Sequence, residues 1–355
     1  MIGATIVKDG VLYVDVDLGM PLTGRVNLAE TPLLMLIGDI RWKHLEHLSG
    51  VVSKMLKDEN GQRVYATFFY VEVWFPPNTP MGSFEENDQF TIVSTMRLYD
   101  EGTADGYHVL YPAAWPEHKK APVMDYREAV SLGVPFVRTS NAFVKMVKGA
   151  SWLKRANPMQ LAPSLVPTAT GMPDSYTLTV KASRESRFRR PDASFTPLTA
   201  GKIKLEYQPD PDRDLNGVGL LYFANYPMAL DVVERRALSG STIVPLSHDL
   251  LDLRTVVHRQ SAYLCNIVPS DSIDVLFEAW IANPFLSNDA RPEASPVRVL
   301  LNFEMSRRSD NRQMMVSTVE KVIHGMTVGE AGLTDALKQL AAAPQRQDVP
   351  AGEAR

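Results

Sequence analysis

Cysteine is almost absent from this sequence: among 355 residues, only Cys265 carries a thiol. One thiol cannot form an internal disulfide, which is typical of a reducing compartment. The sequence also lacks a Cys/His cluster with zinc spacing, so we expect no metal site. His44 and His47 lie three residues apart, but the segment His-Leu-Glu-His matches neither orientation of the zinc-protease motif. We interpret both histidines as part of the solvated end of a helix.

Long apolar runs and a strong net charge are missing as well. No stretch reaches the roughly 18 apolar residues of a membrane span, and the N-terminus lacks the pattern of a signal peptide. The formal net charge is only -4, which does not suggest a nucleic-acid binder. We therefore expect a cytoplasmic protein with no membrane or nucleic-acid partner.

Two common enzyme motifs are absent as well. The sequence has no nucleophile elbow Gly-x-Ser-x-Gly, and Asn216-Gly217-Val218-Gly219 lacks the third glycine of a dinucleotide fingerprint.

What the sequence does contain is an internal repeat. In the first half, alternating residues 5–16 predict a strand, a largely buried helix follows from Asn27, and four strand-like stretches come next. In the second half, one strand precedes a helix that we place from about Leu220 to Ala237, and four strands follow. The expected strands are residues 63–75, 89–98, 106–111 and 135–147 in the first half, and 202–207, 253–265, 272–281, 297–306 and 313–322 in the second.

A strand, a long apolar helix and four antiparallel strands form the plan of a hot-dog domain. We therefore predict an α+β double hot-dog fold, with two curved antiparallel sheets each wrapped around a long helix. The expected boundaries are residues 1–150 for the catalytic N-terminal domain, 151–200 for a connection with one strand at Tyr176 to Val180, and 201–328 for the C-terminal domain. Residues 329–355 are expected to form a short helix and a disordered tail. A fused pair of this kind would be a monomer or a homodimer.

Each long helix begins near an asparagine, Asn27 or Asn216. Asn27 with Glu30 three residues later is typical of a capping box, so the unpaired N–H groups of Asn27 and Leu28 would lie at the positive end of the helix. Such donors suit the oxyanion of a reacting thioester. A simple N-cap is the alternative interpretation for both asparagines. The basic segment from Arg184 to Arg190, joined by Lys148, Lys154 and Arg155, is either a solvated surface or a contact for coenzyme A phosphates or an acidic carrier protein.

Several segments, in order, resemble a known family. They are Asp17-Leu18-Gly19-Met20-Pro21-Leu22, Ile37-Gly38-Asp39-Ile40-Arg41-Trp42, Tyr65-Ala66-Thr67-Phe68, Phe84-Glu85-Glu86-Asn87-Asp88 and Asp214-Leu215-Asn216-Gly217-Val218-Gly219 with the residues that follow. Together they resemble the bifunctional acyltransferase/decarboxylase family of the leinamycin polyketide pathway. The resemblance implies a double hot-dog fold and a protein that takes methylmalonyl-coenzyme A, decarboxylates it and loads an acyl carrier protein. It also implies a catalytic tyrosine on the first strand after the helix, which is Tyr65 here.

On this basis the first hypothesis is an acyl-CoA decarboxylase/acyltransferase, with Tyr65 and Asn27 as catalytic residues. Leu28, Asn216 and the group Arg138, Ser140 and Asn141 would bind the substrate, the last group near a pantetheine channel. Coenzyme A thioesters and phosphopantetheine would be substrates, with no tightly bound cofactor.

Two other hypotheses stay open at this point. A thioesterase or dehydratase would need an acid or base, for which Glu30, Asp39, Glu234 and His258 are candidates. A non-catalytic module that binds a carrier protein is the third.

Overall fold

The computed structural model describes residues 2–99, 102–146, 153–161, 168–217, 219–240, 243–244, 246–267, 271–286 and 291–342. Both predicted repeats are present, and most predicted strands fall within a few residues of their positions. The first repeat contains β1 (Ile2–Lys8), β2 (Val11–Asp17), β3 (Thr23–Gly24), β4 (Asn27–Leu28), α1 (Glu30–Ser49), β5 (Tyr65–Trp74), β6 (Gln89–Ser94), β7 (Arg97–Tyr99), β8 (Thr103–Pro112), α2 (Tyr126–Ser131), β9 (Phe136–Met146) and β10 (Leu153–Arg155).

The connection and the second repeat follow the same plan with extra helices. They contain β11 (Thr168–Ala169), α3 (Asp174–Glu185), β12 (Phe195–Pro197), β13 (Ile203–Tyr207), α4 (Pro211–Asp214), α5 (Asn225–Leu238), α6 (His248–Asp252), β14 (Arg254–Tyr263), β15 (Ile273–Ala282), β16 (Pro296–Arg307), β17 (Gln313–Thr327) and α7 (Thr334–Ala342). The predicted tail beyond this helix lies outside the described residues.

One continuous sheet carries both repeats, in the order β1-β2-β6-β8-β9-β5-β14-β17-β16-β15-β12, with β13 also paired to β15. The order of the five central strands of the first repeat recurs in the second: β5 corresponds to β14, β9 to β17, β8 to β16, β6 to β15 and β2 to β13. The two halves meet where β5 pairs antiparallel with β14, from His258 opposite Trp74 to Ala262 opposite Tyr70. The predicted pair of sheets is therefore joined edge to edge.

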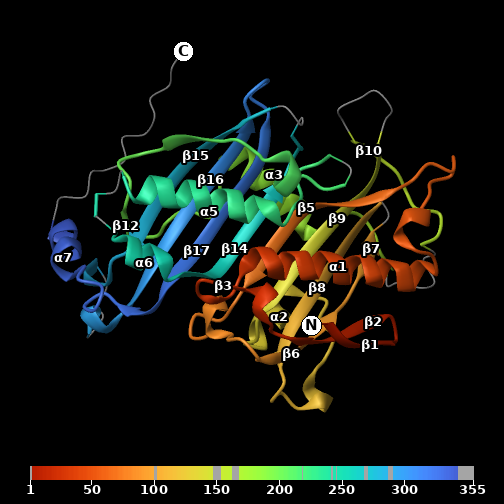
Figure 1. Ribbon diagram of the computed structural model, residues 1–355, viewed down its shortest axis with the longest axis horizontal. Helices are drawn as coiled ribbons and strands as arrows, with labels where there is room; N and C mark the ends of the chain where they lie inside the picture. The colour runs from red at the N-terminus through yellow and green to blue at the C-terminus, as the bar shows by residue number, and fades with distance from the viewer. Residues whose placement is uncertain are drawn as a thin grey trace.

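The two long helices lie side by side on one face of this sheet, and α3 lies on the other (Figure 1). The alternation along β9 shows the division, because neighbouring strand residues point to opposite faces. Asn141 accepts a hydrogen bond from Arg41 of α1, whereas the hydroxyl of Ser140 contacts Ser175 of α3. None of the helices in the described residues is both long and apolar enough to cross a membrane.

The predicted buried helix is confirmed as α1, with Leu33, Ile37 and Ile40 fully buried, but its predicted start is wrong. The helix begins at Glu30 after an Ala29 N-cap, and no side chain caps it. Asn27 instead has a left-handed backbone (φ 49°) inside the short strand β4. Asparagine tolerates this conformation better than most residues, so it suits the tight turn that precedes the helix.

Three further elements differ from the prediction. Residues 5–16, predicted as one strand, form the end of β1, a turn at Asp9 and Gly10, and most of β2, and the two strands pair antiparallel. The second long helix starts at Asn225, because the described residues between α4 and α5 (215–217 and 219–224) form a loop in which Leu215 bridges to Leu221. The segment Tyr176 to Val180, predicted as a strand from its β-branched residues, belongs to α3. Its buried residues Ser175, Thr179 and Ala182 recur at helical spacing, so packing against the sheet outweighs the local strand propensity.

Candidate functional site

A cavity of about 360 Å³ opens where the two repeats separate. Pairing between β5 and β14 ends at Tyr70 and Ala262. At the same point the register of β5 against β9 shifts between Phe68 and Tyr70, so Phe69 is an extra residue in the strand. Beyond the bulge, the start of β5 and the end of β14 no longer pair with each other, and both line the cavity together with the loop that leads into α5.

Eight of the residues that line the cavity are aromatic. Phe68 packs on Phe223 with ring centroids 4.1 Å apart, and Tyr226 meets Tyr263 edge to face at 5.1 Å. Both phenols are protonated at neutral pH, as an ordinary tyrosine is, and burial raises the pKa of Tyr226 and Tyr263 further. The Tyr263 hydroxyl donates to the carbonyl of Phe223 at 3.3 Å. The residues used below that also line the cavity are Tyr65, Ala142, Arg155, Asn216, Tyr222, Leu264, Cys265 and Asn266.

Tyr65 stands at the first position of β5, and the Arg63 guanidinium lies 4.6 Å from the centre of its ring. The predicted catalytic tyrosine therefore lines the same cavity as Asn216. Asn216 accepts a hydrogen bond from the backbone N–H of Leu220 at 3.1 Å, which closes the tip of the loop.

The loop before α5 is held from both sides. The buried Asp214 carboxylate accepts hydrogen bonds from the Tyr207 hydroxyl at 2.8 Å and the Arg213 guanidinium at 2.8 Å. Burial raises the pKa of Asp214, but these hydrogen bonds outweigh it and lower the pKa, so the carboxylate stays charged. On the other side, the Asn266 side chain accepts from the N–H of Leu221 at 2.8 Å. The cavity wall is thus preorganised.

Helix α1 completes the wall through a glycine. A Cβ atom at Gly38 would lie 2.9 Å from the Tyr222 hydroxyl oxygen and 3.0 Å from the Phe223 ring. Because glycine has no Cβ, these two aromatic side chains can pack directly on the helix. The repeats are therefore in contact at the cavity itself.

The other predicted asparagine, Asn27, precedes α1 in the first repeat, at the position that corresponds to Asn216 before α5 in the second. Its side-chain amide donates to the carbonyl of Gly82 at 2.7 Å, and the N–H of Leu28 donates to Phe84 at 2.9 Å. The N–H of Gly82 in turn donates to the hydroxyl of Thr255 on β14 at 2.6 Å. A turn thus covers the start of α1, and Asn27 and Leu28 do not meet Tyr65 or Asn216.

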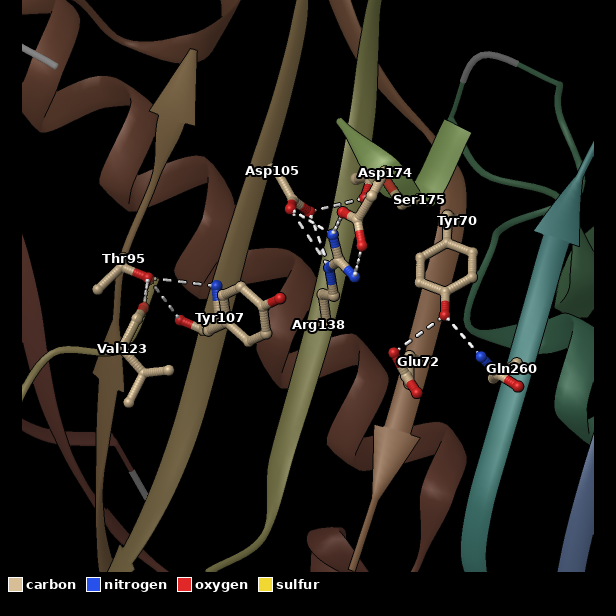
Figure 2. Close-up of polar contacts among 11 residues, drawn as sticks. Tyr70, Glu72, Thr95, Asp105, Tyr107, Val123, Arg138, Asp174, Ser175 and Gln260 are labelled. Atoms are coloured by element: carbon tan, nitrogen blue, oxygen red, sulfur yellow. Dashed lines mark hydrogen bonds and ion pairs between the residues drawn. The ribbon is translucent and has the colours of Figure 1, made fainter. Parts of the chain in front are cut away.

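Arg138 and Ser140 lie on the α3 face of the sheet, and Asn141 on the α1 face. Figure 2 shows the Arg138 guanidinium between the carboxylates of Asp105 and Asp174, which tie α3 to the sheet. The Ser140 hydroxyl donates to Asp105 at 2.7 Å. None of these three residues lines the cavity, but Ala142, the next residue along β9, does.

The acid/base candidates of the second hypothesis lie outside the cavity lining too. Glu30 is bound by Arg259, with Nε 2.6 Å from Oε1, and Asp39 pairs with Lys43 at 2.7 Å. Glu234 is held by Lys321 at 2.6 Å and Arg254 at 2.8 Å. His258 contacts the buried Glu72 at 2.8 Å, next to the Tyr70 hydroxyl that also binds Glu72 (Figure 2).

Sequence reasoning missed Tyr222, Tyr226, Tyr263 and Asn266 as site residues. The tyrosines look like ordinary core aromatics in a pattern, and only the divergence of β5 and β14 brings them together. Asn266 lies past the end of its strand, where no periodicity marks it.

Comparisons with known proteins support the fold. No protein-family model and no curated protein sequence matches this chain. Among solved structures, a Lactobacillus plantarum protein described as an oleoyl thioesterase has a TM-score of 0.55 and 12% identity, over 88% of this chain and 96% of its own. An acyl-ACP thioesterase from Bacteroides thetaiotaomicron has a TM-score of 0.49 and 8% identity, over 88% and 98%. The first likeness, with the repeat described above, establishes a double hot-dog fold.

Proposed function

We propose that this chain is an enzyme that acts on acyl thioesters, and that the cavity between its repeats holds the reacting carbonyl. The observation that carries this proposal is the cavity itself: an aromatic chamber built by both repeats, with protonated phenols beside the start of α5. Apolar walls suit an acyl chain, and phenol donors suit the negative charge that develops on a thioester oxygen.

Hydrolysis of an acyl-coenzyme A or acyl-carrier thioester is the first candidate reaction. It is the activity for which the proteins of similar fold are named. Water would add to the thioester carbonyl, the oxyanion would accept hydrogen bonds from the phenols, and the thiolate would leave and take up a proton. Tyr65, which faces the chamber from β5, is the residue we place at the reacting carbonyl.

Decarboxylation with transfer to a carrier protein is the second candidate, and a specific observation favours it. Among the described lining residues there is no Asp, Glu or His, so the chamber supplies phenols, amides, the Cys265 thiol and the Arg155 guanidinium, but no carboxylate or imidazole base. A malonyl-type thioester needs none, because loss of carbon dioxide itself generates the enolate. The enolate oxygen would accept a hydrogen bond from Tyr65, and the α-carbon would take a proton from water. The carrier's phosphopantetheine thiol would then attack the thioester carbonyl and displace coenzyme A, which leaves as its thiol. The resemblance to the leinamycin-pathway family points to the same reaction.

One experiment separates these reactions. Purified protein is incubated with oleoyl-, malonyl- and methylmalonyl-coenzyme A, each with and without a phosphopantetheinylated carrier protein, and the products are identified by mass spectrometry. Free acid indicates hydrolysis; acetyl or propionyl thioester on the carrier indicates decarboxylation and transfer. We expect Tyr65→Phe to lower turnover by about 100-fold, a typical effect of losing one general acid or oxyanion donor.

The matched control is Tyr13→Phe, a partly buried tyrosine on β2 outside the cavity lining. Its turnover should equal that of the unmodified protein. Intact substrates in every incubation, with the carrier bound but unchanged, would refute the enzymatic proposal in favour of a non-catalytic module. Equal loss in both variants would show that Tyr65 has no special role.

A further inference from the structure

A second cavity, of about 300 Å³, lies on the opposite side of the sheet from α1 and α5, against α3. It shares five wall residues with the first cavity: Phe69, Ala142, Arg155, Tyr263 and Leu264. These residues stand where β5 and β14 have stopped pairing. The two cavities therefore adjoin at a gap in the sheet, where no ladder of backbone hydrogen bonds joins these two strands.

The walls of the second cavity differ in chemistry from those of the reaction chamber. Two guanidinium groups, Arg155 and Arg184, line it, and both residues are exposed. Deeper in the wall, Thr179 is only 6% exposed, and its hydroxyl has no hydrogen-bond partner among the described residues. A buried hydroxyl without a partner costs stability, so a polar group of a ligand in this cavity would gain a hydrogen bond there.

Part of the basic segment has another role. Arg187 pairs with Glu278 at 3.2 Å, and Arg189 pairs with Glu320, so both hold the segment to the sheet. Arg184, one helical turn earlier at the end of α3, has no carboxylate partner among the described residues and lines the cavity instead. In this segment Arg187 and Arg189 therefore form structural ion pairs, whereas the Arg184 guanidinium lies at the opening of the second cavity.

We propose that the phosphopantetheine arm of the thioester enters under α3 and passes through the gap between β5 and β14 to the reaction chamber. Arg155 and Arg184 bind its phosphate at the mouth, and Thr179 hydrogen-bonds an amide of the pantetheine chain. Cationic groups at an exposed mouth suit the phosphate, whereas the aromatic chamber suits the acyl chain, which sets the direction of entry. This inference rests on the proposed action on acyl thioesters and adds the route and the recognition of the phosphate.

The test compares substrates with and without a phosphate. We expect the double variant Arg155→Gln/Arg184→Gln to raise KM for acyl-coenzyme A about tenfold or more, with kcat little changed. The same acyl group on pantetheine, which lacks the phosphate, should keep its KM. An acyl-loaded phosphopantetheinylated carrier forms a third arm, and a raised KM there as well shows that the mouth also accepts a carrier-bound arm. Arg190→Gln is the matched control, since Arg190 is exposed in the same segment but lines neither cavity.

Thr179 is tested separately. Thr179→Val should raise KM for both acyl-coenzyme A and acyl-pantetheine, and Thr179→Ser should restore it, because serine keeps the hydroxyl. If Arg155→Gln/Arg184→Gln raises KM equally for acyl-coenzyme A and acyl-pantetheine, or raises neither, the proposed route is overturned. Binding of free coenzyme A, followed by titration calorimetry, separates this failure from a failure of the proposed function. If the protein shows no turnover but binds coenzyme A, and the double arginine variant does not, the proposed route stands and the proposed reaction is refuted.

Discussion

Two buried histidines, His44 on α1 and His108 on β8, lead to a quantitative prediction about stability at acidic pH. His44, interpreted from sequence as part of a solvated helix end, is in fact completely buried. Its Nε2 donates to the carbonyl of Gly10 at 2.8 Å, while Nδ1 lies 3.3 Å from the Ser94 hydroxyl. The same hydroxyl lies 2.9 Å from Nδ1 of the buried His108. Burial lowers the pKa of His44 to about 4, despite the opposing hydrogen bond to Gly10, and the nearby Arg41 cation lowers it further.

The sign and the size follow from linkage. The pKa of His44 in the folded state is below the unfolded value of about 6.5, so the unfolded chain binds a proton first as the pH falls. The stabilisation is therefore complete above about pH 6.5 and is lost progressively down to the folded pKa. Between about pH 7.5 and pH 5 the integrated loss is ~2 kcal/mol for this one residue. Burial also lowers the pKa of His108, which adds a loss of the same sign.

Urea unfolding at several pH values, followed by tryptophan fluorescence, measures this loss. In His44→Gln, the free energy of unfolding should fall by about 2 kcal/mol less between pH 7.5 and 5 than in the unmodified protein, because glutamine does not titrate. The exposed His118→Gln is the control and should leave the pH dependence unchanged. If His44→Gln retains the full pH dependence, His44 is not held neutral in the folded state and the reasoning is refuted.

Two substitutions test contacts between the repeats. Glu30→Gln should destabilise the protein by about 3 kcal/mol in urea unfolding, because it removes the closer carboxylate partner of the buried Arg259 guanidinium and leaves only Asp231 at 3.7 Å; an effect below about 1 kcal/mol would contradict a buried ion pair. Gly38→Ala should lower the melting temperature and raise KM, since its Cβ would meet the Tyr222 oxygen at 2.9 Å and overpacking costs about 1 to 3 kcal/mol. Alanine favours a helix over glycine by about 1 kcal/mol, so a net gain in stability would disprove the close contact.

The sequence was sufficient for the repeat, the order of strands and most of their bounds. Strand alternation and a long buried helix are local patterns, and they recur in both halves. The bulge at Phe69 could not be predicted in this way, because it depends on the partner strand β9 rather than on residues near Phe69. The same holds for α3, where burial of Thr179 and Ala182 against the sheet outweighs β-branched residues that favour a strand.

For the candidate site, the resemblance located Tyr65, and pattern located Asn216 but misplaced the helix beside it. Two aspects of the site depend on distant contacts. The start of α5 is displaced to Asn225 because Asp214, held by Tyr207 and Arg213, fixes a loop before it. His44 is buried because the β1–β2 turn, through the carbonyl of Gly10, closes over the helix. Neither contact is visible in a helical or strand periodicity.

The two ends of the pseudo-symmetric molecule differ for a steric reason that accounts for the position of the site. At the start of α1, the turn at Gly82 packs so closely that a Cβ atom there would lie 2.6 Å from Val26 and 3.0 Å from Thr255. That glycine allows the turn to fill the space between α1 and β14 and to hydrogen-bond across it. At the start of α5, the corresponding space borders the β5 bulge, and aromatic rings stand around it rather than backbone. The first end therefore joins the repeats, and the second leaves open the cavity in which we propose that the thioester binds.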